Sequence, residues 1–246
     1  MKLESLPKFY APKSPNLGAT APATGGDRMT ITDVMTAQGF VQSKTPLGFA
    51  LFLAKAGIQT PEPAIELLAK IAWELAPACR AVNVLPGNQR AAVCDVLATM
   101  AYQDYSRSAA SVRPCDCCAG DGFITAEVFT MKMAGVVHRQ VREIERILCA
   151  NCKGKRVISN SCRCHGKGRV LDASGEVLLW KECDRCRGRG YSRLKFSAVL
   201  VALLRVWPEL KKTTAYNEVQ PFFEILVTHC HREEAAAEQQ LQVVTR

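Results

Sequence analysis

Residues 115–122 read CDCCAGDG, residues 149–156 read CANCKGKR, residues 161–168 read SCRCHGKG and residues 183–190 read CDRCRGRG. All four share the pattern C-x-x-C-x-G-x-G, which the first and fourth match fully, and each copy is called a knuckle below. The second knuckle has Arg156 where a glycine is expected, and the third has Ser161 at the first cysteine position with Cys162 one residue late. Residues 115–190, which contain all four knuckles, hold nine of the twelve cysteines, and the rest of the chain is organised around them.

The spacing within a knuckle suits a metal ion. Two cysteines three residues apart on a tight turn point both sulfurs at one ion, and two such turns complete a tetrahedral Zn(Cys)4 site. The glycines that follow suit turns that need positive φ. Eight ligands predict two zinc ions, with Cys117 as a spare thiol and His165 as an alternative to one sulfur of the third knuckle. Disulfides are the alternative chemistry, but they are typical of small secreted chains, and no signal peptide is apparent here.

The four knuckles resemble the cysteine-rich domain of DnaJ chaperones, in which the outer repeats share one zinc and the inner repeats share the other. That resemblance implies a first zinc bound by Cys115, Cys118, Cys183 and Cys186, and a second bound by Cys149, Cys152, Cys162 and Cys164. A DnaJ-like zinc-dependent protein-binding module is therefore an alternative function. The chain lacks the His-Pro-Asp tripeptide of a J domain, so the knuckles support the scaffold and not the chaperone activity.

The charge balance of the chain is basic. It has 32 Lys+Arg against 23 Asp+Glu, a net charge of +9, and residues 149–195 alone carry twelve Lys/Arg against four Asp/Glu. Such a patch suggests a nucleic acid or an acidic protein surface as partner, and a solvated face is the alternative interpretation. No apolar run is long enough to cross a membrane, so we expect a cytoplasmic protein without a membrane partner.

Apolar residues recur at helical spacing on both sides of the knuckles. Residues 1–28 are rich in proline and predict a flexible N-terminal arm. In the helical region, residues 29–112, caps and apolar stripes predict helices over 32–42, 46–57, 62–77 and 90–108. Cys79 and Cys94 lie on or beside these helices, and we expect them to fill the core.

The zinc-binding module covers residues 113–192, and the C-terminal helices cover residues 193–246. In the module a strand follows the first knuckle, residues 137–148 fit either a strand or a helix, and residues 169–180 predict a hairpin. Residues 196–206 and 214–229 predict a helix-turn-helix, with a third helix over the tail. The predicted fold class is mainly α, with a helical N-terminal bundle and a C-terminal helix-turn-helix interrupted by a β-hairpin-rich, DnaJ-like zinc-binding module.

The predicted helix-turn-helix supplies candidate DNA-binding residues, because a recognition helix presents its first residues to base edges. The turn and the start of the second helix offer Lys211, Lys212, Thr213, Thr214 and Asn217. Asparagine can read adenine, and lysine can read guanine or hold phosphate. Around the fourth knuckle the phosphate-binding candidates are Arg187, Arg189, Arg193 and Lys195. The alternative for each is a solvated surface residue.

Several separate stretches resemble the Q antitermination proteins of lambdoid phages. They are MKLESLPKFYAPKSP at the start, TDVMTAQGFVQS (32–43), LATMAYQDYSRSAAS (97–111), KECDRCRGRGYSR (181–193) and HCHREE (229–234). Lambda-like members of that family have a single pair of knuckles, corresponding to Cys115/Cys118 and Cys183/Cys186. The resemblance therefore implies an insertion that carries two further knuckles, in the residue range 124–175.

The resemblance implies a bacteriophage transcription factor and not an enzyme. Q proteins of this kind bind DNA at the late promoter, load onto RNA polymerase held at a promoter-proximal pause, and travel with it through terminators. Their loading involves the polymerase flap and the primary sigma factor. One alternative is a promoter-bound DNA-binding activator. Another is a metalloenzyme, which an all-cysteine site disfavours because catalytic zinc keeps an open coordination position.

Overall fold

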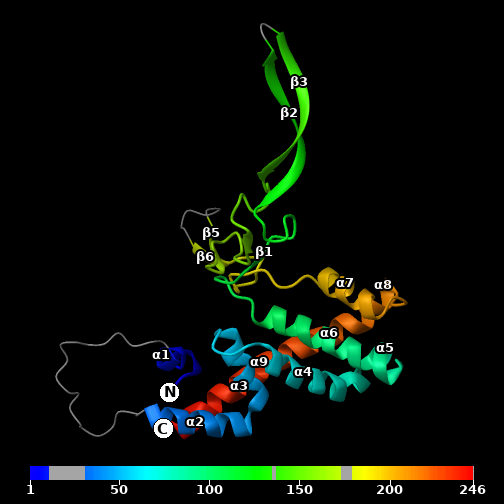
Figure 1. Ribbon diagram of the computed structural model, residues 1–246. Coiled ribbons are helices and arrows are strands. Elements are labelled where there is room, and N and C mark those ends of the chain that lie inside the picture. The colour runs from blue at the N-terminus through cyan, green and yellow to red at the C-terminus, as the bar shows by residue number, and fades with distance from the viewer. Residues whose placement is uncertain (11–30, 135–136, 173–178, 246) are drawn as a thin grey trace, which may run out of the picture. The chain divides into compact units, whose positions relative to one another are not determined.

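The computed structural model describes residues 1–10, 31–134, 137–172 and 179–245. The chain forms two units: a helical unit made of Met1–Ser106 and Leu194–Arg246, and a cysteine-rich unit made of Arg107–Arg193 (Figure 1). The helical unit is thus built from two distant parts of the sequence. The N-terminal and C-terminal helical regions belong to the same unit and share one hydrophobic core.

Helices account for most of the residues that the structure describes, so the protein is mainly α. The helices that precede the knuckles are η1 (Leu3–Ser5), α1 (Pro7–Tyr10), α2 (Ile31–Lys44), α3 (Pro46–Lys55), α4 (Glu62–Leu75), η2 (Ala76–Ala78), α5 (Arg80–Asn83) and α6 (Gly87–Tyr105). Their ends follow local chemistry: Gly57, at φ 71°, lies just beyond the end of α3, and Pro77 cannot continue α4 as an α-helix. Within the described ranges, no helix is both long enough and apolar enough to cross a membrane.

The long C-terminal helix α9 (Gln220–Val244) organises the core of the helical unit, where it contacts α2, α3 and α6 (Figure 1). Its Phe222, Phe223 and Leu226 are almost fully buried and pack in one cluster with Leu97 and Leu203. Burying one such side chain is worth about 1.5–3 kcal/mol. The expected core role of Cys79 and Cys94 is confirmed, since both are buried in this cluster.

A buried hydrogen bond joins the two places where the chain leaves the helical unit and returns to it. Asp104, near the end of α6, is 2% exposed, and its Oδ1 accepts a hydrogen bond from the backbone N–H of Leu194 over 2.6 Å. Leu194 lies directly before α7 (Phe196–Val206). A buried carboxylate needs such a donor, because burying an unpaired charge is costly. The cysteine-rich unit is therefore inserted between two neighbouring points of the helical unit.

The C-terminal chain after α7 forms one uninterrupted helix of mixed type. It starts with α8 (Lys212–Thr214), passes through a π-helical turn, η3 (Ala215–Val219), and continues as α9. The π turn has a covalent reason: Pro221 has no N–H to bond the carbonyl of Asn217, and a wider turn accommodates the missing bond. The prediction of a separate third helix over the tail is wrong, because α9 runs through it without a break.

The first ten residues do not behave as the flexible arm that their composition predicts. Leu3 and Leu6 are buried in a second cluster, together with residues of α2, α3 and α9. The backbone N–H of Leu3 also donates to Glu238 Oε2 over 2.6 Å. Leu3 and Leu6 therefore anchor this segment, and Met1 packs against the same cluster. The rest of the predicted arm, residues 11–28, lies outside the described residues.

Three antiparallel strand pairs make up the regular part of the cysteine-rich unit. β1 (Val112–Pro114) pairs with β4 (Val157–Ser159), β2 (Phe123–Ala134) with β3 (Val137–Leu148), and β5 (Arg169–Asp172) with β6 (Leu179–Glu182). Residues 137–148, which the sequence leaves open between strand and helix, are a strand. The predicted turn between β5 and β6 lies largely outside the described residues.

Candidate metal centres and nucleic-acid surface

The antiparallel pairs β2–β3 and β5–β6 each bring two knuckles together and produce a cluster of four sulfurs. At the base of β2–β3, the first cluster contains Cys115, Cys118, Cys149 and Cys152. At the base of β5–β6, the second cluster contains Cys162, Cys164, Cys183 and Cys186. All eight side chains are buried, and the sulfurs of each cluster lie within 4.8 Å of one another.

The pairing of the knuckles is sequential, so the nested pairing implied by the DnaJ resemblance is wrong for this chain. Nesting requires Cys115 and Cys118 to share an ion with Cys183 and Cys186, and Cys149 and Cys152 to share one with Cys162 and Cys164. The strand register excludes it, because Phe123 lies opposite Leu148. The first knuckle ends at Gly122 and the second begins at Cys149, so this register sets the two side by side.

Both clusters are built on the same reciprocal backbone contact. In the first, the N–H of Cys115 donates to the carbonyl of Arg156, and the N–H of Cys149 donates to the carbonyl of Gly122, each over 2.9 Å. The second cluster repeats the pattern over 2.8 and 2.9 Å, from Cys162 to Gly190 and from Cys183 to Gly168. The first cysteine of every knuckle is thus bonded to the last residue of its partner knuckle.

The glycines of the repeat allow this close contact. Gly168 and Gly190 have φ of 72° and 79°, a conformation that residues with a Cβ rarely adopt. A Cβ on Gly168 would lie 2.1 Å from the carbonyl oxygen of Gly188. Arg156, which stands where the repeat expects glycine, still has φ 67°. The second knuckle therefore keeps the fold of the others and stores some strain.

The sulfur positions fit a tetrahedral zinc ion. Zn–S bonds of about 2.3 Å place two thiolates of one tetrahedron about 3.8 Å apart. In the first cluster the Sγ–Sγ distances are 3.8 Å for Cys115–Cys149 and 3.6 Å for Cys118–Cys152. In the second cluster the cross-knuckle distances are both 3.8 Å, for Cys162–Cys183 and Cys164–Cys186. Disulfide bonds need about 2.05 Å, so the geometry favours a metal over oxidation.

Backbone N–H groups of the knuckles stabilise thiolates. The N–H of Gly122 donates to Cys118 Sγ over 3.2 Å, and the N–H of Gly168 to Cys164 Sγ over 3.3 Å. The backbone N–H of Cys152 lowers the pKa of Cys149 to about 6, and that of Cys186 lowers the pKa of Cys183 to about 7. Zinc binds thiolate and not thiol, so the contacts at Cys149 and Cys183 favour the metal-binding form, whereas burial raises the pKa of Cys152 and that of Cys186 to about 11.

Two further side chains of the repeat stay outside the clusters. His165, the alternative ligand of the third knuckle, is exposed at φ 55°, while Cys162 and Cys164 both face the second cluster. Cys117, the spare thiol, is exposed beside the first cluster. The remaining three cysteines, Cys79, Cys94 and Cys230, are buried in the helical unit. The twelve cysteines therefore fall into three environments: eight in the sulfur clusters, one exposed beside them and three in the core of the helical unit.

The candidate DNA-binding residues of the helical unit lie around the start of α8. Lys211, Lys212, Thr213 and Asn217 are exposed, and Thr214 is half-buried. Lys195 is also exposed and directly precedes α7. The ring of Phe196, the next residue, lies edge-on to the ring of Tyr216 at 5.2 Å. The start of α7 therefore lies beside the π-helical turn, which brings Lys195 to the same end of the helix pair.

The remaining candidates belong to the cysteine-rich unit. Arg187 and Arg189 are exposed on the fourth knuckle, and Arg193 is half-buried after it. Arg187 has φ 48°, because it occupies the turn that follows Cys186. The second cluster thus fixes the backbone from which the first two arginines project. Exposure and positive charge make both available to phosphate.

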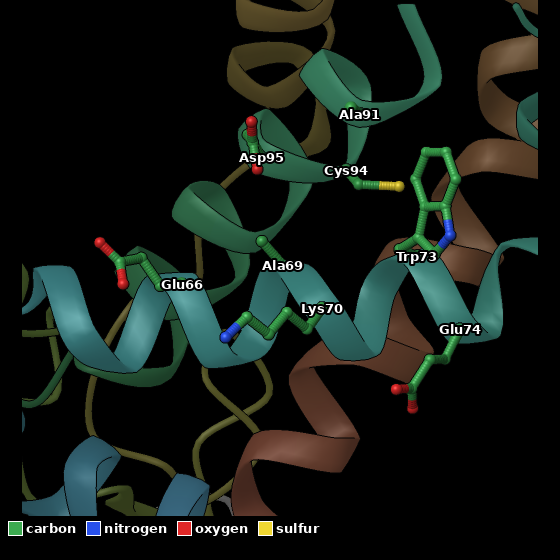
Figure 2. Close-up of a pocket in the computed structure, with 8 residues that line it drawn as sticks. All are labelled: Glu66, Ala69, Lys70, Trp73, Glu74, Ala91, Cys94 and Asp95. Carbon is green, nitrogen blue, oxygen red and sulfur yellow. The ribbon is translucent and has the colours of Figure 1, made fainter. Parts of the chain in front are cut away.

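A cavity of about 550 Å³ lies between α4 and α6 in the helical unit (Figure 2). Trp73 and Cys94 line its apolar part, while Glu66, Lys70 and Asp95 line its charged part. Burial raises the pKa of the Cys94 thiol to about 11. A thiol with such a pKa is a poor nucleophile, and no histidine is among the eight residues that line this cavity. The cavity therefore offers no nucleophile–base pair.

The chain is similar to known proteins over its full length. A family model described as antitermination protein Q matches residues 23–109 and 156–238. The chain is 44% identical over 256 residues to the prophage antitermination protein Q homolog QuuQ of Escherichia coli K12, with 100% of both chains covered. It is 34% identical over 253 residues to antitermination protein Q of Escherichia phage lambda, and 33% to that of Salmonella phage P22, again over 100% of both chains.

The family model leaves out residues 110–155. This gap contains β2, β3 and all four cysteines of the first cluster, whereas the second cluster lies within the matched residues. The added segment is therefore not at 124–175, as the family resemblance implied. Because its own two knuckles pair with each other, the added segment can form a metal centre without disturbing the one that follows it.

Proposed function

The chain belongs to the antitermination protein Q family, and on that premise we propose that it is a phage or prophage late-gene antitermination factor. It binds DNA at the late promoter, loads onto RNA polymerase at a promoter-proximal pause and makes the enzyme read through terminators. The observation that carries this proposal is the identity to antitermination proteins over the whole chain, 34% in the case of phage lambda.

Each sulfur cluster binds one zinc ion. Cys115, Cys118, Cys149 and Cys152 bind the first, and Cys162, Cys164, Cys183 and Cys186 bind the second. The sulfur separations of 3.6–3.8 Å support this assignment. Zinc with four thiolate ligands keeps no open coordination position, so its contribution is to cross-link two knuckles. The knuckle backbone then holds Arg187 and Arg189 in fixed positions.

DNA binds to the helix-turn-helix formed by α7 and the helix that begins at α8. Lys211 and Lys212 hold phosphates, with Thr213 and Thr214 beside them, and Asn217 reads a base edge. Lys195 and the arginines Arg187, Arg189 and Arg193 add phosphate contacts. Their positive charge and the net charge of +9 support this role. Phosphate neutralisation releases counterions, so the affinity for DNA falls steeply with salt.

The polymerase contacts replace the DNA contacts during loading. The flap region of the host RNA polymerase and the primary sigma factor are the partners at this step. Contacts made mainly with phosphates can be released when the protein leaves the promoter. The contacts that travel with the enzyme bury apolar surface, as stable protein interfaces do at their centres.

Transcription in vitro with purified RNA polymerase tests the proposal. On a template that carries the cognate late promoter and a distal terminator, the protein should cause read-through, even when competitor DNA is added after the polymerase leaves the pause. A template without the promoter element should give none. If late competitor abolishes read-through, the protein does not travel with the enzyme, and a promoter-bound activator becomes the better description.

Two variants separate the proposed phosphate and base contacts. Lys211→Ala should weaken binding to every DNA sequence alike and make the salt dependence shallower by about one ion. Asn217→Ala should reduce discrimination between the promoter element and a variant site, because a base contact is worth about 1–3 kcal/mol of specificity. If both variants keep the affinity and the sequence discrimination of the wild type, this helix is not part of the DNA interface.

A further inference from the structure

The hairpin β2–β3 exposes a row of large apolar side chains on one face. Residues that lie opposite each other in an antiparallel pair share a face, and so do alternate residues of a strand. By the observed register, one face carries Phe123, Thr125, Glu127, Phe129 and Met131 from β2, and Gln140, Arg142, Ile144, Arg146 and Leu148 from β3. We call this the outer face. The alternation from Phe123 to Met131 is the sequence signal that could have indicated it.

Water, and not protein, covers most of the outer face. Phe129 is 60% exposed, Met131 67%, Ile144 72% and Leu148 59%. On the opposite face, Ile124, Val128, Val141 and Ile147 are half-buried. Contiguous exposed apolar side chains on a soluble protein indicate an interaction site. A two-stranded ribbon is also only marginally stable alone, so this face gains stability when a partner covers it.

Two arginines lie flat on the outer face and extend its stacking surface. The guanidinium of Arg146 is 4.7 Å from the ring centroid of Phe123, and that of Arg142 is 5.5 Å from the ring of Phe129. Arg146 also binds both carboxylate oxygens of Asp121, over 2.7 and 2.8 Å, and Arg142 lies 3.3 Å from Glu127. Both side chains are therefore held in place before any partner binds, which lowers the entropy cost of binding.

The composition of this face matches a protein interface better than a nucleic-acid interface. Aromatic residues, methionine and arginine are the types enriched in protein–protein contacts. A phosphate would have to displace Asp121 or Glu127 from the arginines, and it would approach a hairpin that also carries Glu143 and Glu145. Nucleic acid is thereby disfavoured on this hairpin.

We propose that the outer face of β2–β3 docks on a protein partner that offers an apolar groove with carboxylates at its rim. The groove covers Phe129, Met131 and Ile144, and the rim carboxylates meet the remaining N–H donors of Arg142 and Arg146. The first zinc cluster holds the base of the hairpin rigid. Because the segment falls in the gap of the family model, this contact is an addition to those shared by the family. The partner is a subunit of RNA polymerase, a step that rests on the proposed function.

Site-specific photocrosslinking tests which molecule covers the face. A benzoylphenylalanine at position 129, on the outer face, is compared with one at position 128, on the opposite face. With the full-length protein, purified RNA polymerase holoenzyme and a late-promoter template, position 129 should crosslink to a polymerase subunit at least tenfold more than position 128. Equal yields would overturn the proposal. So would crosslinks from position 129 to nucleic acid, to a second copy of the chain or to the helical unit of the same chain.

A matched pair of double substitutions tests the energetic role. Phe129→Thr with Ile144→Thr removes apolar area from the outer face and keeps residues that favour strands. Val128→Thr with Val141→Thr makes the same change on the opposite face. The outer-face variant should bind polymerase at least tenfold more weakly, with zinc content and DNA affinity unchanged, and the control should change less than threefold. If the wild type and the outer-face variant cause equal read-through, the docking face is rejected and the proposed function stands. If the wild type causes no read-through, the proposed function and this inference are rejected together.

Discussion

Gly48, on α3, marks a place where the helical unit has no room for a single methyl group. A Cβ at this position would lie 2.0 Å from the carbonyl oxygen of Glu233 on α9. Gly48→Ala should therefore destabilise the protein by about 1–3 kcal/mol, the usual cost of overpacking. Gly39 on α2 is the matched control, since nothing lies within 4 Å of its Cβ position. Gly39→Ala should stabilise by about 0.5–1 kcal/mol. Urea unfolding measures both, and destabilisation by both substitutions would contradict the packing argument.

Cysteine reactivity is set residue by residue by burial and metal binding. Burial raises the pKa of Cys94 to about 11 and that of Cys230 to about 12, so both stay protonated at neutral pH and unreactive in the folded protein. Cys117 is exposed and lies outside both clusters, so it is accessible although its hydrogen bond with Cys149 raises the pKa of its thiol. Alkylation of the native, zinc-loaded protein followed by peptide mass analysis should label Cys117 first. Rapid labelling of any cluster cysteine before Cys117 would show that its site holds no metal.

At the scale of elements, the hairpins decide which knuckles come together in one sulfur cluster. Val112 of β1 lies opposite Ser159 of β4, so a two-residue Asn-Gly turn can replace residues 113–158 between them. The shortened protein should keep one zinc, bound by the second cluster, whereas nested pairing would leave none. Elemental analysis gives the stoichiometry. As a control, Cys183→Ser in the shortened protein should remove the remaining ion.

At the scale of the whole molecule, the proposed zinc ions and the packing of helices would stabilise different units. The two apolar clusters of the helical unit contain no residue of the cysteine-rich unit, while the cysteine-rich unit has the two sulfur clusters in place of a large apolar core. A strong zinc chelator should therefore make residues 107–193 sensitive to protease, because metal-binding free energy is folding free energy in such modules. The far-UV helical signal should be largely retained. Loss of that signal in parallel with zinc would mean that the units fold as one.

The sequence by itself determined what depends on residues close together in the chain. Two cysteines three residues apart and the glycines behind them specify a knuckle, and an apolar stripe with a cap specifies α4 or α7, because each interaction spans a few residues. The tertiary structure alone decided which knuckles pair, since that depends on strand register across β2–β3. It also decided that residues 137–148 are a strand, because Val137, Val141, Ile144 and Leu148 recur at a spacing that suits a helix equally well. Likewise, Leu3 and Leu6 are ordered only because distant residues of α9 and α3 provide an apolar surface for them.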